Sequence, residues 1–407
     1  MYENLALLAG FVLLYSSIAG GLERTWLSGP ILFTAFGVLI GPVGLDLLSF
    51  ETDRETLKTL AELTLALVLF TDAAGADLGV LRKRAGLPMR LLLFGLPLTI
   101  AIGYVAGIAL SVNLSALEVA LVATMLAPTD AALGKAVVTN AAVPDDVRQG
   151  LNVESGLNDG ICVPILFAFL ALARDVGPQA EPWSLVLGLV AEQLGIGLLV
   201  GVVLTGFVVQ LLRLSARHHW LTGTWLQIPV VALALTCFAT AQWLGGSGFI
   251  AAFTGGLLFG YVERKHREML LRAAEGTGDT FALITWVIFG SAVVGQALGY
   301  FSWRILVYAV LSLTVIRMLP VYLSLTGTGL SDESKLFIGW FGPRGLASIV
   351  FGVIVLNAGL PEGGAMAMVV VCTIVLSILA HGVSANPWAR AFGRRSGQVQ
   401  SRPPSRQ

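Results

Sequence analysis

Charged residues are scarce in this 407-residue chain. Only 12% of its residues are Asp, Glu, Lys or Arg, whereas soluble domains carry about 25%. Cysteine is also rare, and Cys162, Cys237 and Cys372 all lie in apolar runs, so we expect packing residues rather than disulfides or a metal site. The basic and acidic totals are equal at 25 each, which gives no reason to expect nucleic-acid binding. These shortages exclude a soluble globular enzyme, a disordered chain and a disulfide-rich secreted domain.

Long apolar runs are what the chain has instead, with 56% hydrophobic residues and 47 glycines. A membrane-spanning helix needs about 20 mostly apolar residues. The runs are continuous and too long for the roughly ten-residue alternating strands of a membrane barrel. The sequence therefore predicts an all-α polytopic membrane protein with about thirteen transmembrane helices, over residues 5–22, 27–48, 57–76, 89–111, 116–138, 150–173, 183–213, 225–244, 247–262, 279–298, 302–325, 334–357 and 363–386.

The basic residues gather in alternate connections between these runs. Lys and Arg cluster after the third, seventh, ninth and thirteenth runs, whereas the connections at 111–115, 244–247 and 358–362 contain none. The positive-inside rule places the basic connections and the C-terminus in the cytoplasm, so thirteen spans put the N-terminus outside. The long seventh run then separates two sets of six with opposite topology, as in an inverted-repeat transporter. Residues 387–407 are expected to form a short basic cytoplasmic tail.

Two runs contain a proline beside a charged residue near their middle. Pro128 precedes Asp130 in the fifth run, and Pro343 precedes Arg344 in the twelfth, which is the fifth of its own set. Proline removes a backbone donor, and unpaired backbone at membrane depth is tolerated only where it is buried in protein or lines a cavity. Matching breaks in two repeats point to a binding site near the midplane. Ordinary proline kinks are the alternative, which the charged neighbours disfavour.

The sixth run carries two carboxylates, Glu154 and Asp159, at membrane depth. A charge there is costly, so each is a candidate functional group. Ser155 and Asp159 are four residues apart and share a helix face, whereas Glu154 and Asp159 are separated by about 140°. The two carboxylates are therefore expected to serve different neighbours. The Asp159 carboxylate and the Ser155 hydroxyl on the same face suit a hard cation, which prefers oxygen ligands. Thr129 and Asp130 at the break would complete the shell. A structural polar bridge is the alternative for Asp159.

Other ionisable residues inside the runs fall into supporting roles. Glu154 needs a cationic partner, and we favour Arg317 in the eleventh run, with Arg344 satisfying carbonyls or helix ends near the twelfth-run break. Asp72 lies near the middle of the third run and is a tentative member of an ion path. His381 stands alone in an apolar run and is expected to be a packed polar residue.

Three motifs occur in a fixed order along the chain: Ala127-Pro-Thr-Asp130, Glu154-Ser-Gly-Leu-Asn-Asp159 and Gly342-Pro-Arg-Gly345. Together they resemble the sodium/proton antiporters of the cation:proton antiporter superfamily. The resemblance is to the electroneutral bacterial and archaeal branch that is related to animal sodium/proton exchangers, and it covers essentially the whole chain. The family often has proline after the Thr-Asp pair, where this chain has Ala131.

The resemblance implies roles for the motif residues. Asp159 is expected to carry the transported cation or proton, with Asn158 as the marker of the electroneutral branch. The expected Na⁺ ligands are Asp159, Asp130, Thr129 and Ser155. Glu154 is expected to be a structural carboxylate paired with an arginine.

The resemblance also implies an organisation and an activity. It predicts one transmembrane domain over residues 1–386, with a scaffold at about 5–76 and 183–298 and an ion-carrying core at about 89–173 and 302–386. The expected protein is a homodimer in the inner membrane that exchanges Na⁺ or Li⁺ for H⁺ in an electroneutral cycle and supports pH homeostasis. It needs no cofactor and no soluble partner. A K⁺/H⁺ exchanger or organic-acid carrier of the same fold and a gated cation channel are the alternatives.

Overall fold

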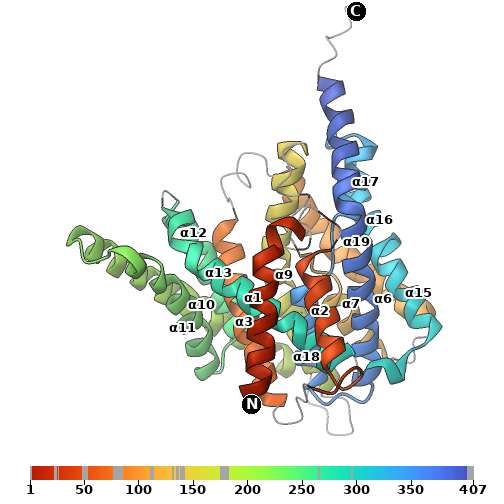
Figure 1. The fold of residues 1–407 in the computed structure, drawn as a ribbon, viewed down its shortest axis with the longest axis horizontal. Coiled ribbons are helices and arrows are strands. Elements are labelled where there is room, and N and C mark those ends of the chain that lie inside the picture. The colour runs from red at the N-terminus through yellow and green to blue at the C-terminus, as the bar shows by residue number, and fades with distance from the viewer. Residues whose placement is uncertain are drawn as a thin grey trace, which may run out of the picture.

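A computed structural model describes residues 2–22, 25, 27–47, 54–76, 86–110, 114–130, 133, 137, 143–174, 183–264, 266–294 and 297–400. Within these ranges every regular element is a helix, as the continuous apolar runs predict (Figure 1). Six of the described helical segments are long and apolar enough to cross a membrane: Gly86–Leu110, Asp145–Arg174, Val190–Arg217, Arg267–Val294, Trp303–Ser324 and Gly363–Arg395. Shorter apolar helices accompany them, so the chain is a multi-pass membrane protein.

The helices follow the chain in the order expected from the apolar runs. Two of the long segments include a π-helical stretch, at Leu91–Gly95 and at Phe289–Val294. The main helices are α1 (Tyr2–Leu22), α2 (Gly29–Ile40), α3 (Arg54–Gly75), α5 (Gly86–Arg90), α6 (Leu96–Leu110), α7 (Ala116–Met125), α9 (Asp145–Arg174), α10 (Trp183–Arg217), α11 (Ile228–Trp243), α12 (Gly248–Val262), α13 (Arg267–Ile288), α15 (Trp303–Leu313), α16 (Val315–Ser324), α17 (Asp332–Trp340), α18 (Leu346–Leu356) and α19 (Gly363–Gln400).

Several boundaries differ from the expected ones. The helix expected at 279 begins at Arg267, because a charged helical stretch precedes its apolar part. The helix expected to end at residue 386 continues through Pro387 to Gln400, so the first part of the expected tail, residues 387–400, is helical and continuous with the last apolar run. The extension has a physical cause, since Phe392 is buried and stacks on Phe337 of α17 with ring centroids 4.3 Å apart. Residues 401–407 lie outside the described part.

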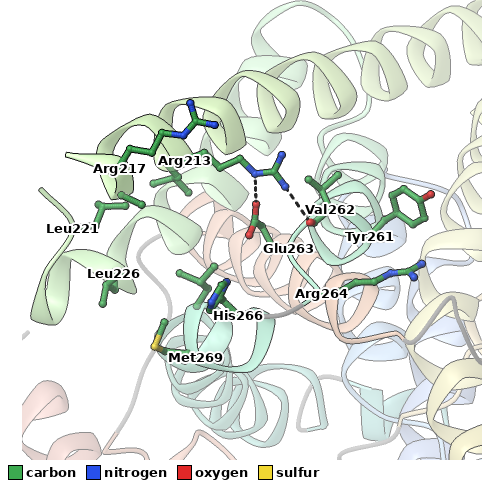
Figure 2. A pocket seen from close by; sticks show the side chains of 13 residues that line it. Arg213, Arg217, Leu221, Leu226, Tyr261, Val262, Glu263, Arg264, His266 and Met269 are labelled. Carbon is green, nitrogen blue, oxygen red and sulfur yellow. Dashed lines mark hydrogen bonds and ion pairs between the residues drawn. The ribbon is translucent and has the colours of Figure 1, made fainter. Parts of the chain in front are cut away.

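The packing brings distant segments of the chain together. α1 begins at one end of the bundle and α19 finishes at the other (Figure 1). α10 and α12 lie side by side, and an ion pair joins their ends, with Arg213 Nε 2.9 Å from Glu263 Oε1 (Figure 2). α3 and α12 approach closely because Gly260 has no side chain; a Cβ there would lie 2.2 Å from the Ala74 carbonyl oxygen.

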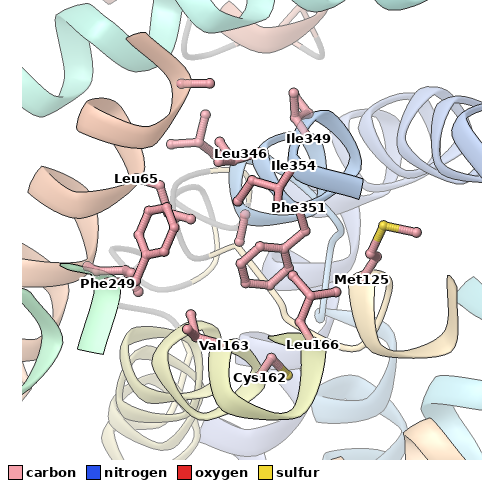
Figure 3. Close-up of a cluster of buried hydrophobic side chains, with 14 of the residues drawn as sticks. Leu65, Met125, Cys162, Val163, Leu166, Phe249, Leu346, Ile349, Phe351 and Ile354 are labelled. Carbon is pink, nitrogen blue, oxygen red and sulfur yellow. The ribbon is translucent and has the colours of Figure 1, made fainter. Parts of the chain in front are cut away.

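A continuous apolar core joins the two halves of the chain. Leu65 of α3, Phe249 of α12, Leu166 of α9 and Phe351 of α18 all belong to it (Figure 3). Cys162 lies in the same cluster, and the three cysteines are buried and free, as their apolar surroundings predict. This core holds α9 between the two halves, where polar residues of its other faces meet Thr129, which follows α7, and Arg317 of α16.

Both expected helix breaks are present in the described residues. α7 ends at Met125, and the segment that follows, 126–130, is not helical. α17 ends at Trp340 and α18 begins at Leu346, which leaves 341–345 non-helical. A third interruption was not expected: α15 and α16 are separated at Thr314, whose φ of −109° and ψ of −95° are not helical.

Candidate functional site

The two non-helical segments lie against each other and exchange hydrogen bonds. The backbone amide of Asp130 donates to the Pro343 carbonyl at 2.8 Å. Arg344 is fully buried, and its Nη1 donates to the carbonyls of Ala127 and Pro128 at 2.7 and 3.0 Å. Carbonyls left without helical partners at membrane depth require such donors. The arginine of one break therefore satisfies the backbone of the other.

Asp130 performs the reciprocal task. Its Oδ2 accepts a hydrogen bond from the Leu346 amide at 2.9 Å, and its Oδ1 accepts one from the Leu133 amide at 3.3 Å. A carboxylate is favourable at the first turn of a helix because the free amides and the helix dipole are positive there. Gly345 makes room for it, since a Cβ at that position would lie 1.9 Å from Asp130 Oδ2. Asp130 thus caps α18 as well as facing the break.

α19 makes hydrogen-bond contacts with the second break. Ser377 Oγ accepts a hydrogen bond from the Arg344 amide at 2.7 Å, and His381 Nε2 lies 2.8 Å from the Trp340 carbonyl oxygen, which can only accept. The other ring nitrogen, Nδ1, lies 2.8 Å from the Ser377 carbonyl oxygen and 3.2 Å from its hydroxyl. Sequence reasoning missed this role. The available signal was the four-residue spacing of Ser377 and His381 on one face of an apolar helix.

The Glu154 face of α9 is neutralised within the protein. Arg317 of α16 donates from Nη1 to Oε1 at 2.6 Å and from Nη2 to Oε2 at 2.8 Å, and each side chain is only 1% exposed. Gly342 leaves space for this guanidinium, since a Cβ there would lie 2.4 Å from Arg317 Nε. The structure therefore contains the arginine pair favoured from the sequence, and it places Arg344 at the break carbonyls.

An adjoining part of α9 meets the first break. Ser155 Oγ donates to the Thr129 carbonyl at 2.6 Å, and Asn158 Nδ2 donates to Thr129 Oγ1 at 2.7 Å. Asp159 is 7% exposed. Its Oδ1 and the Asn158 Oδ1 are buried acceptors with no hydrogen-bond partner among the described residues. Buried acceptors normally have partners, so these two oxygens are the ones left available to a cation or a proton.

Asp72 lies next to this face. Its backbone carbonyl packs on Gly156 of α9, where a Cβ would lie 3.1 Å away, and its own side chain is exposed. The described ranges hold no group of three or more His, Cys, Asp or Glu side chains arranged as a metal site. The candidate ligands are instead oxygens of carboxylate, amide and hydroxyl groups.

Comparison with known proteins gives a consistent family. Residues 7–391 match the model of the transmembrane sodium/hydrogen exchanger family. The chain is 26% identical over 361 residues to the K⁺/H⁺ antiporter NhaP2 of Shewanella oneidensis, which covers 88% of this chain and 62% of that protein. It is 26% identical over 391 residues to the K⁺/H⁺ antiporter NhaP of Alkalimonas amylolytica, covering 95% of this chain and 67% of the relative.

The fold has a solved counterpart. The sodium proton antiporter MjNhaP1 of Methanocaldococcus jannaschii superposes with a TM-score of 0.76 at 21% identity, covering 94% of this chain and 98% of that one. The chain spans less than two thirds of the length of the Shewanella relative, whereas it corresponds to nearly all of the archaeal structure. The match over residues 7–391, together with the two helix breaks, shows that the chain belongs to the sodium/hydrogen exchanger family of transporters rather than to an enzyme family.

Proposed function

We propose that the chain is a secondary active antiporter that exchanges Na⁺ or Li⁺ for H⁺, with the exchange occurring at Asp159. The observation that carries the proposal is the buried Asp159 carboxylate, whose Oδ1 has no partner among the described residues. A charged, empty carboxylate is costly in a dry barrier. It therefore crosses only when it carries a cation or a proton, and this rule makes the exchange obligatory.

The neighbouring groups fit the role of cation ligands. Asn158 Oδ1 is also buried without a partner, and Ser155 and Thr129 bring hydroxyl oxygens to the same face of α9. Asp130 brings two carboxylate oxygens to the same break, each accepting a hydrogen bond from a backbone amide. We infer that the Na⁺ ligands are Asp159, Asp130, Thr129 and Ser155, with Asn158 orienting Thr129.

One exchanging carboxylate gives one cation for one proton. Glu154 is neutralised by Arg317, and Asp130 is held by the first turn of α18, so neither is placed to change its charge in the cycle. Asp72 belongs to α3 and faces the site from outside the hydrogen-bonded network. We assign it to the ion path and infer an electroneutral cycle.

The hydrogen bonds of the site support a division into core and scaffold. They join α7, α9, α16, α18 and α19, all of which fall in the expected core at about 89–173 and 302–386. We propose that this core moves against a scaffold at about 5–76 and 183–298 within one domain, residues 1–386, of thirteen spans with inverted repeats. A homodimer in the inner membrane, with the N-terminus outside and the C-terminus cytoplasmic, completes the proposal, and pH homeostasis is its expected role.

Potassium is the second candidate cation. Both curated relatives described above are named K⁺/H⁺ antiporters, and the mixed oxygen ligands do not select between alkali ions. A gated cation channel is less favoured, because the paired breaks are the feature expected of an alternating-access transporter.

The test is proton flux in proteoliposomes of the full chain, scanned over Na⁺, Li⁺ and K⁺. Asp159→Asn should abolish cation-driven proton movement, because the variant side chain binds no exchangeable proton. Glu192→Gln is the matched control, since Glu192 is an exposed carboxylate on α10; it should exchange normally. Normal flux from Asp159→Asn refutes the assignment, and the cation that drives flux in the native chain decides between Na⁺ and K⁺.

A further inference from the structure

A cavity separate from the ion site lies at the ends of three helices. It has a volume of about 830 Å³ and is formed by the end of α10, the segment leading to α11, the end of α12 and the start of α13 (Figure 2). None of its lining residues takes part in the network around Asp159. We propose that this cavity binds the phosphate headgroup of an anionic phospholipid, independently of the ion-exchange function proposed above.

The polar lining of the cavity is strongly basic. Arg213, Arg217 and Arg264 line it together with His266, and Glu263 is the only carboxylate among its lining residues. Glu263 is already engaged by Arg213 at 2.9 Å, so it does not offset the other two guanidinium groups. Arg217 and Arg264 are both exposed. Guanidinium groups recognise phosphate oxygens through paired hydrogen bonds, which makes an anionic phosphate the matching ligand.

The contacts of two arginines place their side chains at the cavity. Arg213 Nη2 also donates to the Val262 carbonyl at 3.2 Å, which fixes it across the gap between α10 and α12. The Arg264 guanidinium lies over the Tyr261 ring, 4.8 Å from its centroid. In Figure 2 the labelled basic side chains come from both sides of the cavity. The helix ends therefore hold a divided basic rim rather than a run of charges along one segment.

The remaining lining is apolar, which suits a lipid better than a free phosphate. Leu212, Leu221, Leu226, Met269 and Leu270 contribute to it. A soluble phosphate gains nothing from such a surface, whereas acyl chains and glycerol carbons of a lipid bury against it. The mixed lining thus matches a ligand that is anionic at one end and apolar at the other.

Aromatic residues indicate that the cavity lies at headgroup depth. Trp220 and Trp225, in the segment between α10 and α11, are 69% and 64% exposed, and Tyr261 is 56% exposed. Exposed Trp and Tyr side chains concentrate where a membrane meets water. Basic pockets between transmembrane helices at that level are suited to anionic headgroups. The positive-inside rule places this basic connection on the cytoplasmic side, where anionic lipids are exposed to it.

The test is lipid binding by the full chain purified in detergent, measured by native mass spectrometry and by the lipid-induced rise in unfolding temperature. Phosphatidylglycerol, phosphatidylcholine with the same acyl chains, and inorganic phosphate are compared. The double variant Arg217→Gln/Arg264→Gln should lower the affinity for phosphatidylglycerol by at least about tenfold. Arg217→Lys/Arg264→Lys, which keeps the charge, should recover part of the binding.

Arg390→Gln/Arg394→Gln is the matched control, since it removes two exposed arginines of α19 that do not line the cavity. It should bind phosphatidylglycerol like the native chain. The proposal is overturned if the cavity variant and the control lose the same affinity, or if phosphatidylcholine binds the native chain as tightly as phosphatidylglycerol. Equal stabilisation by inorganic phosphate alone would assign the cavity to a soluble anion instead.

Discussion

At the scale of single residues, helix geometry gives Glu154 and Asp159, two carboxylates of one helix, different environments. Glu154 and Asp159 lie on different faces of α9, and only the Glu154 face meets an arginine. The Asp159 face meets backbone and side-chain oxygens of the first break. We assign Glu154 a structural role because its carboxylate has a bidentate arginine partner. The Asp159 Oδ1 atom has no hydrogen-bond partner among the described residues, which leaves it available for binding. The two environments differ because Glu154 and Asp159 are separated by about 140° around the helix axis.

The structural role of Glu154 can be measured directly. Glu154→Gln should lower the free energy of unfolding by about 3–5 kcal/mol, because it leaves the Arg317 guanidinium buried without a counter-charge. Glu333→Gln is the matched control, since it breaks an exposed pair with Arg395 and should cost no more than about 1 kcal/mol. Denaturant unfolding in detergent reads out both. A double variant, Glu154→Gln/Arg317→Gln, should be more stable than Glu154→Gln alone. Equal losses of stability in Glu154→Gln and in the control Glu333→Gln would contradict a structural pair.

Gly345 offers a test of the Asp130 position. Gly345→Ala puts a methyl group 1.9 Å from the present position of Asp130 Oδ2, so the carboxylate must leave the first turn of α18. We expect a loss of at least about tenfold in exchange rate, since small misplacements of binding groups are costly. Gly352→Ala in the same helix is the control, because its nearest atom would lie at an ordinary 3.5 Å. Normal exchange by Gly345→Ala in proteoliposomes would show that Asp130 need not occupy this position.

At the scale of elements, the two breaks are stable because each completes the other. Arg344 covers the carbonyls of Ala127 and Pro128, and Asp130 covers the Leu346 amide. This exchange leaves the backbone satisfied without water, as a midplane segment requires. α19 then fixes the second break through Ser377 and His381, which makes it part of the site although it carries no carboxylate there.

The contribution of α19 can be separated from simple packing. His381→Leu removes the side-chain donor from the Trp340 carbonyl, which then keeps the Gly342 amide at 2.8 Å, and the loss of one buried hydrogen bond costs about 0.5–1.5 kcal/mol. His381→Gln keeps an N–H group that can reach this oxygen. We expect His381→Leu to reduce both unfolding temperature and exchange rate, and His381→Gln to restore part of each. Identical behaviour of the two variants would show that the ring fills space only.

Sequence patterns predicted these elements where local chemistry decides the structure. Pro128 and Pro343 mark both breaks, and residue spacing separates the Glu154 and Asp159 faces. The missed features depend on tertiary packing. α19 extends past Pro387 because Phe392 stacks on Phe337, and Thr314 interrupts an apolar run that contains no proline at that position. The spacing of Ser377 and His381 puts them on one face of α19, but they gain their role only when α19 packs against the break.

At the scale of the whole molecule, we infer a membrane orientation from the charge distribution and from the positions of the two ends of the bundle. α1 begins and α19 finishes at opposite ends of the bundle (Figure 1), which an odd number of crossings requires. The cavity at the ends of α10 and α12 lies among basic residues and exposed aromatic residues, as expected where a helix bundle leaves the membrane. The ion site and this cavity therefore lie at different depths and use different chemistry, buried oxygens at one and guanidinium groups at the other.

The number of charges that move in one cycle is a property of the whole molecule, and it tests the assignment of a single exchanging carboxylate. Glu154 is paired and Asp130 caps α18, so in the proposed cycle Asp159 alone alternates between a cation and a proton. The loaded core then has the same charge in both directions. Each unbalanced charge would couple to the membrane potential by about 2.3 kcal/mol per 100 mV, which is roughly a fiftyfold change in equilibrium.

An imposed potassium-diffusion potential should therefore leave the sodium-driven exchange rate and the final proton gradient of native proteoliposomes unchanged. Sodium is the driving ion here so that the potential can be set separately with potassium. A final gradient that shifts with the potential would require a second carboxylate that exchanges protons in the cycle. Asp72 would be that group, since it lies on the scaffold helix α3 with its backbone against Gly156 of α9. Asp72→Asn should then abolish the voltage dependence, whereas in the one-carboxylate cycle it leaves the stoichiometry unaltered.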